Sequence, residues 1–246
     1  MRTLLFLVLI AFVSCKQEDK ALTAQQIIDK SIEVNGANTL DASILTFDFR
    51  NRNYKATRNQ GKFELERTIQ NDTLLVHDVL SNNDFVRHIN TKKIHIPDSM
   101  KTRYSGSVNS VHYFSILPYG LNDLAVHKKR LEDVTINDEA YYKIEVRFSE
   151  EGGGEDFEDV FIYWIGKEDF KMDFLAYSYL TNGGGKRFRL PNNERIINGV
   201  RFLDFDNYKP KNASTKLENL DKAFENSELE KLSEINLENI SVEFIQ

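Results

Sequence analysis

One stretch, residues 157–189, constrains the fold of this chain more than any other. Residues 160–165 are apolar or aromatic at every position, so the strand that they form is either covered on both faces or lines a cavity. A second strand is expected at residues 170–179, and TNGGG at 181–185 supplies residues that tolerate the positive φ angles of a hairpin turn. Two adjacent strands with this much aromatic surface require a large partner surface from the rest of the chain.

Alternating apolar and polar residues predict further strands on both sides of this stretch. Most of these patterns turn one face toward a core and the other toward solvent. Asn198-Gly199 is a strong signal for a hairpin between two of them. We expect strands at residues 45–49, 63–69, 74–80, 85–89, 93–96, 142–148, 194–197, 200–208 and 240–244. Their regular spacing, with few intervening helices, favours an antiparallel meander.

Three segments have helical patterns. Thr23 and Gln26 have the spacing of a capping box, and the apolar residues after them form a helix face that Asn35-Gly36 can close in a left-handed conformation. Residues 97–118 break the meander and carry apolar residues at helical spacing. This segment is either a helix that covers the sheet as a plug or lid, or a surface loop with aromatic anchors. A short late helix is expected near residues 217–224.

The N-terminus indicates export. Residues 1–14 combine a positive start with an apolar run of signal-peptide length, which is short for a membrane span. The run ends at Phe12-Val13-Ser14-Cys15, which resembles a bacterial lipobox, and Cys15 is the only cysteine. We therefore predict a lipoprotein signal peptide, cleavage before Cys15, and acylation of Cys15 as a durable membrane anchor. The alternative is an ordinary secretory peptide whose cleavage site contains a cysteine by coincidence.

The polar residues 15–22 form a lipidated tether, which is either a simple solvated linker or a tag for export to the cell surface. Residues 23–246 contain no repeat or internal linker, and we interpret them as a single domain. We expect the protein in the bacterial cell envelope, lipid-anchored to the outer membrane, on its periplasmic face or at the cell surface. The net charge of −6, with both signs interleaved, argues against nucleic acid as a partner, because the phosphate backbone requires a concentrated positive surface.

Several motifs resemble the DUF6503 family, which comprises uncharacterised bacterial lipoproteins of the LolA-like group. They are FIYWI at 161–165, DFLAYSY at 173–179, GGGKRFR at 183–189 and INGVRF at 197–202, and the segment 27–36 resembles the opening helix of the wider group. The resemblance implies a mainly β (α+β) fold: an incompletely closed antiparallel β-barrel with an N-terminal helix, one or two covering helices and an apolar cavity. Better-known relatives carry lipoproteins or other acylated molecules across the periplasm. The resemblance implies no catalytic residues.

No motif points to catalysis, a cofactor or a metal. Two glycine triplets lack the strand–loop–helix context of phosphate-binding loops, there is no Gly-x-Ser-x-Gly elbow, and an acylated Cys15 cannot act as a nucleophile. His88 and His95 could face each other across a turn, with His77 as a conceivable third metal ligand. The alternative is that these histidines occupy ordinary polar positions on strands. We therefore predict neither a cofactor nor a metal site.

Amphipathic aromatic side chains remain as candidates for a ligand site. The residues that we expect to line the mouth of a cavity are Phe114, Tyr163, Trp164, Tyr177 and Tyr179. The alternative is that they belong to the core. Arg67 falls on the apolar face of its strand, where it meets either a ligand head group or a buried carboxylate.

Three functions are consistent with these observations. The leading hypothesis is a membrane-anchored envelope lipoprotein that binds a lipid or other apolar ligand in a half-barrel cavity, without catalysis. The second is an envelope or cell-surface scaffold whose sheet edge or aromatic patch binds another protein. The third is a hydrolase of unrecognised type. An open apolar cavity beside the strands of Tyr163 and Tyr177 favours the first hypothesis, and a filled core counts against it.

Overall fold

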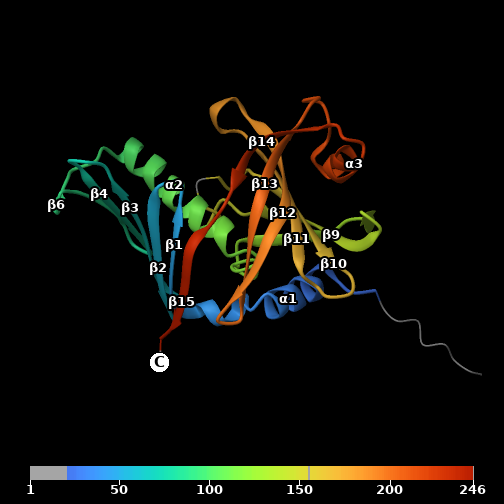
Figure 1. Ribbon diagram of the computed structural model, residues 1–246, viewed down its shortest axis with the longest axis horizontal. Helices are drawn as coiled ribbons and strands as arrows, with labels where there is room; N and C mark the ends of the chain where they lie inside the picture. Colours follow the sequence, from blue (N-terminus) through green and yellow to red (C-terminus); the bar gives the residue numbers. More distant parts are fainter. Residues whose placement is uncertain (1–20, 155, 246) are drawn as a thin grey trace, which may run out of the picture.

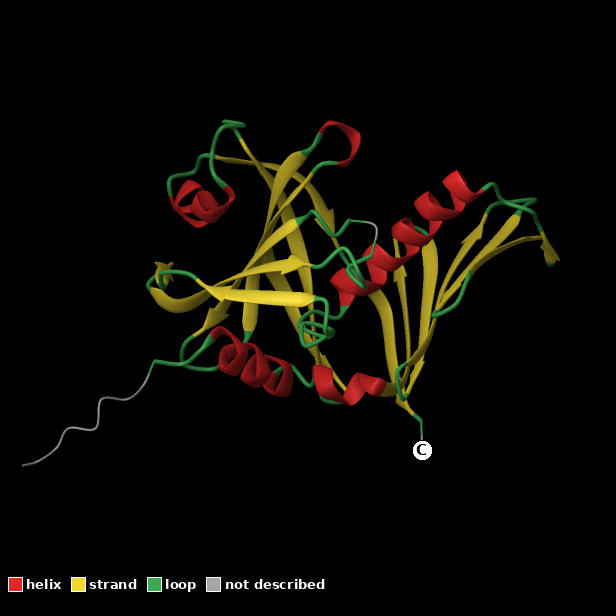
Figure 2. Ribbon diagram, turned by 180° about the vertical axis from the view of Figure 1, so that it is seen from behind, coloured by secondary structure: helices red, strands yellow, loops and turns green. Residues whose placement is uncertain are grey.

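Two antiparallel sheets, set at an angle to each other, form the body of the molecule in the computed structural model (Figure 1 and Figure 2). The model describes residues 21–154 and 156–245. The sheets do not close into a barrel, as the sequence predicted. The expected signal peptide, Cys15 and most of the tether lie outside the described residues.

The first sheet contains the predicted meander and has the strand order β15-β1-β2-β3-β4-β5-β6. One of its strands, β2, was not predicted, because Tyr54 and Ala56 are the only apolar residues on its inner face. The expected strand at 93–96 is shorter and is reduced to β6. The strands are β1 (Ala42–Phe49), β2 (Arg52–Asn59), β3 (Lys62–Gln70), β4 (Leu75–Ser81), β5 (Phe85–Ile89), β6 (Lys92–Lys93) and β15 (Glu238–Phe244).

The second sheet has the order β14-β13-β12-β11-β10-β9-β7, with β8 paired to β9. Its strands are β7 (Val126–Arg130), β8 (Val134–Ile136), β9 (Glu139–Phe148), β10 (Val160–Gly166), β11 (Met172–Tyr179), β12 (Gly185–Ile197), β13 (Val200–Pro210) and β14 (Leu229–Ile235). The expected hairpin between β12 and β13 turns at Asn198-Gly199, both with positive φ. The sequence did not predict β7, β8 or β14, and it divided β12 into two pieces because Pro191 and a bulge after Asn192 interrupt the pattern.

Strand β10 lies inside the second sheet, between β9 and β11, and both of its faces are covered, which is one of the two environments that its apolar sequence allowed. On the inner face, Phe161, Tyr163 and Ile165 pack with residues of the two longer helices, α1 (Ala24–Val34) and α2 (Asp98–Ser115). On the outer face, Ile162 and Trp164 pack with the short helix α3 (Leu220–Glu225) and the 3-10 turn η3 (Leu217–Asn219) before it. Figure 1 shows α3 outside the second sheet, away from α2.

The predicted capping box is present at the start of α1, where Thr23 and Gln26 bond reciprocally. Ile27 and Ile28 bury the apolar face of this helix against the second sheet. The helix ends at Val34 with Asn35 as its C-cap, and Gly36, which has φ 68°, precedes the 3-10 turn η1 (Ala37–Asp41). A Cβ atom at position 36 would lie 2.0 Å from the carbonyl oxygen of Gly199, so this crossing of α1 over the β12–β13 hairpin requires glycine.

Helix α2 is the predicted covering helix, and it lies between the two sheets (Figure 2). Val108 packs into the core of the first sheet, together with Ile116 just after the helix. Tyr113 and Phe114, at its C-terminal end, pack against the second sheet instead. The helix therefore separates the inner faces of the sheets and determines what space remains between them.

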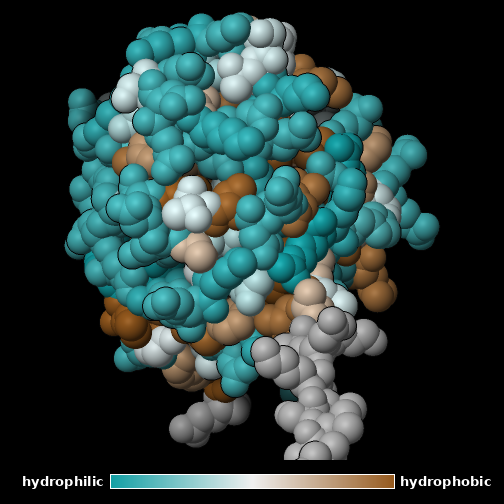
Figure 3. All heavy atoms as spheres, turned by 90° about the vertical axis from the view of Figure 1, so that its right-hand side faces the viewer, coloured by the Kyte–Doolittle hydropathy of each residue, from teal (hydrophilic) through white to brown (hydrophobic). Residues whose placement is uncertain are grey.

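The chain crosses from the second sheet to the first between β14 and β15, so the last strand ties the two sheets together. No helix in the described part of the chain is long and apolar enough to cross a membrane. Figure 3 shows one face of the molecule, where small groups of hydrophobic residues lie among hydrophilic ones.

Candidate functional site

Two cavities flank α2 between the sheets. The larger, which we call the large cavity, has a volume of about 650 Å³, and the smaller, which we call the small cavity, has about 390 Å³. The apolar wall of the large cavity includes Phe63, Leu65, Leu80, Tyr113, Phe114, Ile116, Val126, Phe148 and Phe161. That of the small cavity includes Phe49, Val111, Phe114, Tyr177, Tyr179, Leu203, Phe205, Ile235 and Leu237.

Small side chains on α2 explain why this space is left open. Ser105, Gly106 and Asn109 line the large cavity, and Ser110 lines both cavities. These residues are too short to fill the gap between sheets that aromatic residues hold apart. A side chain the size of tryptophan at position 110 would occupy volume in both cavities.

Phe114 lies at the boundary of the two cavities and contributes to both walls. Its ring centroid is 6.0 Å from that of Phe161 and 5.2 Å from that of Tyr177. Rotation of this one side chain would change the connection between the cavities.

Three of the aromatic residues that the sequence proposed for the cavity mouth line a cavity: Phe114, Tyr177 and Tyr179. Tyr163 lines neither. It is fully buried in the core, where its hydroxyl group lies 2.8 Å from that of Tyr113, and burial raises the pKa of Tyr163 well above its ordinary value. The expectation for these residues came from their amphipathic aromatic side chains, and residue type alone cannot show that other side chains cover Tyr163.

Trp164 does not line a cavity either, because it points to the opposite face of β10. Its indole Nε1 donates to Oδ2 of Asp221 at 3.4 Å, and Lys143 pairs with the same carboxylate at 2.8 Å. The interpretation of Tyr163 and Trp164 as neighbours in one site is wrong, since adjacent residues on a strand face opposite ways. The helix that covers Trp164 was expected from the sequence, but its position was not.

Arg67 is buried on the inner face of β3 and does not reach either cavity. Its guanidinium donates to Asp78 at 2.7 Å and to the hydroxyl group of Ser107 on α2 at 2.8 Å. Arg87 also donates to Asp78, at 2.5 Å. Of the two partners considered for Arg67, the structure therefore shows the buried carboxylate.

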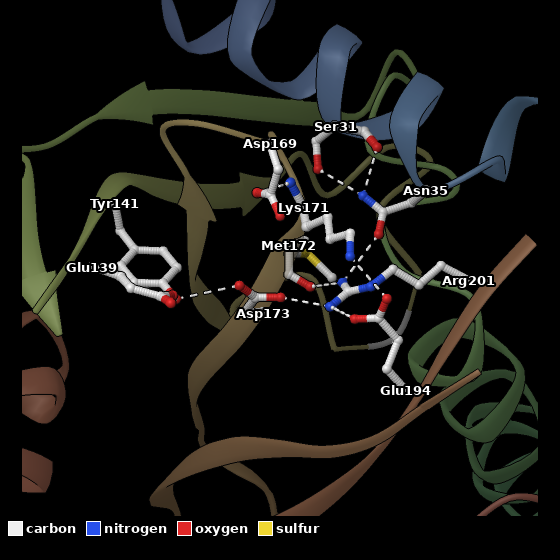
Figure 4. A network of polar contacts seen from close by, with 10 residues as sticks. All are labelled: Ser31, Asn35, Glu139, Tyr141, Asp169, Lys171, Met172, Asp173, Glu194 and Arg201. Carbon is white, nitrogen blue, oxygen red and sulfur yellow. Dashed lines mark hydrogen bonds and ion pairs between the residues drawn. The ribbon is translucent and has the colours of Figure 1, made fainter. Parts of the chain in front are cut away.

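Arg201 is a second buried arginine that pairs with carboxylates, through Nη2, while its Nε has no hydrogen-bond partner among the described residues (Figure 4). It donates to Asp173 at 2.6 Å, to Glu194 at 2.9 Å and to the carbonyl oxygen of Met172 at 2.7 Å. It also donates to the side-chain oxygen of Asn35 at 3.2 Å. This network ties the end of α1 to β11, β12 and β13, which is a structural role.

Two further buried arginines have no carboxylate partner among the described residues, and the sequence did not single them out. Arg189 lines the small cavity and Arg58 lines the large one. Each has one buried guanidinium nitrogen without a hydrogen-bond partner, Nε in Arg189 and Nη1 in Arg58. Burial lowers the pKa of both.

Two other titratable groups beside the cavities have shifted pKa values. Burial, reinforced by the charge of Asp156, raises the pKa of Asp159 to about 6, and Asp159 lies on both cavity walls. Burial lowers the pKa of His112 to about 4. Nε2 of His112 also lies 3.0 Å from the carbonyl oxygen of Glu66. The neutral imidazole therefore links α2 to β3 by a hydrogen bond.

No group of three or more histidine, cysteine or acidic side chains in the described chain is arranged to hold a metal ion. His88 and His95 do not face each other, so of the two alternatives for these histidines the metal pair is not formed. His88 lies opposite Lys93 on one side and opposite His77 on the other, and the rings of His77 and His88 are 6.0 Å apart. His77 contacts the carboxylate of Glu66 at 2.8 Å, so it serves a local polar contact.

The fold and the cavities define a class of protein: an open half-barrel of two antiparallel sheets, with a helix and two cavities between them. The model of a family of unknown function, DUF6503, matches residues 2–237, and the chain belongs to this family. The comparison with curated proteins finds no match.

Solved structures with a similar fold include a LolA superfamily protein from Nitrosomonas europaea. It is 12% identical, with a TM-score of 0.51, over 92% of this chain and 94% of that chain. Another is a DUF1329 family protein from Desulfovibrio piger, 8% identical, with a TM-score of 0.51, over 89% of this chain and 92% of that chain. At these identities the likeness is one of fold alone.

Proposed function

We propose that the protein is a membrane-anchored envelope lipoprotein that binds a lipid or other apolar ligand between its two sheets, without catalysing a reaction. The observation that carries this proposal is the pair of aromatic-walled cavities on either side of α2. Their volumes fall within the range of about 300–1,000 Å³ that is usual for small-molecule sites.

The energetics of such a site follow from its walls. Each methylene group transferred from water into an apolar cavity contributes about 0.8 kcal/mol, so an acyl chain gains affinity with every carbon that the cavity accommodates. Both cavities are already open beside the packed rings of Phe114, Phe161 and Tyr177. Little conformational cost is therefore needed to open space for a chain.

The anchoring part of the proposal rests on Cys15 and the apolar run before it. Acylation of this cysteine would hold the half-barrel near the outer membrane, on its periplasmic face or at the cell surface. A protein that is held beside a bilayer meets lipids at high local concentration, which suits a site for apolar ligands.

The test is ligand retention by the mature domain, purified without detergent. We expect native mass spectrometry or lipid extraction to find a bound amphiphile, and we expect the emptied protein to take up a fluorescent fatty-acyl probe. Protein that is consistently empty and takes up no probe would contradict the proposal. If the same protein crosslinks in cells to a stoichiometric protein partner, the scaffold hypothesis replaces it.

A matched pair of variants connects uptake to the cavities. Ser110→Trp places a large side chain where both cavities meet α2, and we expect it to reduce probe binding at least tenfold. Thr102→Trp adds the same side chain to an exposed position of the same helix and should leave binding within twofold. Equal binding by both variants would mean that the probe binds elsewhere.

A further inference from the structure

Arg189 has an unusual environment for a buried charge. The side chain is 7% exposed, and its guanidinium group meets aromatic rings rather than an acid. The guanidinium carbon is 3.9 Å from the centroid of Phe114 and 5.3 Å from that of Tyr177. Its hydrogen bond to a described residue is a long one, 3.4 Å, to the hydroxyl group of Tyr177, and Nε has no partner.

The other buried arginines show what a structural arginine looks like in this fold. Arg67 and Arg201 are buried to the same degree, and their guanidinium nitrogens lie 2.7 Å and 2.6 Å from carboxylate oxygens. A buried ion without a counterion is strongly destabilising. The fold satisfies this requirement at two arginines and leaves it unsatisfied at Arg189, on the wall of a cavity.

The small cavity is also the positively charged one, although the whole chain carries a net charge of −6. Arg187 and Arg189 lie on the same face of β12, and Arg50, which follows β1 of the first sheet, also lines this cavity. The described acidic groups on this wall are Asp156 and Asp159, so arginines outnumber acids by three to two. The wall of the large cavity has the opposite balance, with Arg58 and Lys62 against Asp41, Asp123, Asp156 and Asp159.

Arg58 differs from Arg189 in its surroundings. Its guanidinium carbon lies 5.1 Å from the ring centroid of Tyr119, whose hydroxyl group donates to Asp41 at 2.8 Å. An acid is therefore close to Arg58 through one intervening side chain. Arg189 has a tyrosine hydroxyl group beside it but no such acid among the described residues.

We propose that the small cavity binds the anionic head group of the protein's apolar ligand, a carboxylate or a phosphate monoester, at Arg189. This inference rests on the proposed function, because the tail of the ligand occupies the apolar space beside Phe114. Nε, which is buried without a partner among the described residues, and Nη2, which makes the long hydrogen bond to Tyr177, form the edge of the guanidinium group that binds a carboxylate or phosphate through two parallel hydrogen bonds. The ligand class is then a single-headed anionic amphiphile, and its tail extends past Phe114 toward the large cavity.

The experiment is a competition assay with delipidated mature protein and the neutral apolar dye N-phenyl-1-naphthylamine. The competitors are palmitate, hexadecyl phosphate and hexadecanol, which share a sixteen-carbon tail, and acetate and inorganic phosphate, which have none. We expect palmitate and hexadecyl phosphate to bind at least tenfold more tightly than hexadecanol. Acetate and inorganic phosphate should not compete at millimolar concentration.

The decisive variant is Arg189→Met, which keeps much of the apolar volume of the side chain and removes the charge. We expect the affinity of this variant for palmitate to be at least tenfold lower than that of the wild type, and its affinity for hexadecanol to stay within twofold. Its melting temperature should be no lower than that of the wild type, because the substitution removes an unpaired buried charge. Arg58→Met is the matched control, since it removes the other unpaired buried arginine, and it should leave the preference for palmitate intact. If Arg189→Met does not fold, Arg189→Gln takes its place.

Each alternative result has a distinct meaning. If no amphiphile binds, the proposed function fails together with this inference. If palmitate and hexadecanol bind equally well, or if Arg58→Met abolishes the preference instead, the head-group site is overturned while lipid binding stands. Competition by inorganic phosphate as strong as that by hexadecyl phosphate would show a site for a free anion and would also overturn the inference.

Discussion

Four described arginine side chains are less than a tenth exposed, and their partners divide them into two pairs. From the sequence alone, alternation along β3 predicted that Arg67 faces inward, and in the structure Arg67 donates a hydrogen bond to Asp78 there. Arg189 was not singled out from the sequence. It alternates with the buried Phe188 on β12, and both faces of this sheet are covered. A period of two shows that neighbouring residues face opposite ways, but not which faces are buried.

Asp78 is the residue on which the paired arginines of the first sheet depend. It is fully buried and accepts hydrogen bonds from Arg67 and Arg87. Asp78→Ala leaves the charge of Arg67 buried without a counterion, and we expect the free energy of unfolding to fall by about 3–5 kcal/mol. Urea denaturation measures this loss in the free energy of unfolding.

The control for this prediction is Asp84→Ala, which removes the partner of Lys101 from an ion pair whose side chains are each more than a third exposed. An exposed pair contributes little, so this variant should remain close to the wild type. If the free energy of unfolding falls equally in the two variants, burial does not determine how much the ion pairs of Asp78 contribute to stability.

His112 gives the fold a dependence on pH with a definite sign. Burial lowers its pKa from 6.5 to about 4, so below pH 6.5 the unfolded chain takes up a proton that the folded chain does not. The free energy of unfolding should therefore fall as the pH decreases from 6.5 to 4, by about 1.4 kcal/mol per pH unit and roughly 3 kcal/mol in total.

His112→Phe isolates this contribution, because it keeps an aromatic ring against Phe47 and Tyr54 and removes the titrating group. Other groups titrate in both proteins, so the quantity to measure is the difference between the two unfolding free energies at several pH values. We expect the wild type to lose its advantage over the variant as the pH falls. A difference that stays constant from pH 7 to pH 4 would contradict the pKa assigned to His112.

At the scale of elements, strong local patterns were predictable and weak ones were not. The capping box of α1, the aromatic strands β10 and β11 and the hairpin at Asn198-Gly199 follow from nearby residues. Strand β14 carries alternating charges and exists because β13 offers it a partner edge. The family resemblance implied an apolar cavity, but its position beside α2 could not be predicted, because the small residues of α2 have meaning only once two sheets are known to flank them.

Gly36 joins two elements, and its replacement tests how closely they approach. Gly36→Ala requires alanine at φ 68° and places its Cβ 2.0 Å from a backbone oxygen of Gly199. The left-handed conformation costs about 1–2 kcal/mol, and displacing the hairpin adds a similar amount. We expect the free energy of unfolding to fall by roughly 3 kcal/mol, as measured by urea denaturation.

Gly61→Ala is the matched control for Gly36→Ala. Gly61 has φ 79°, and no atom lies within 4 Å of the position that its Cβ would take. Only the conformational cost of about 1–2 kcal/mol applies there. If both substitutions are equally costly, the close approach of α1 and the hairpin contributes nothing to stability.

At the scale of the whole molecule, the half-barrel combines a surface with interleaved charges and an interior with two open apolar cavities. A protein of this kind has no need of a membrane span to work with lipids, provided that it is held near a bilayer. The sequence supplies a candidate for this attachment in Cys15, whose apolar run ends where acylation would begin. We therefore expect the proposed anchoring and the proposed ligand binding to be separable, so that each can be removed without the other.

The last prediction concerns this anchor. Expressed with its own leader in a Gram-negative host, the wild-type protein should incorporate radiolabelled palmitate and sediment with the outer membrane. Cys15→Ser should lose the label and leave the membrane fraction, because Cys15 is the only cysteine available for acylation. We also expect the half-barrel of this variant to bind the fluorescent acyl probe within twofold of the delipidated wild type. Label that persists in Cys15→Ser, or a wild type that never acquires label, would show that the chain is exported without this anchor.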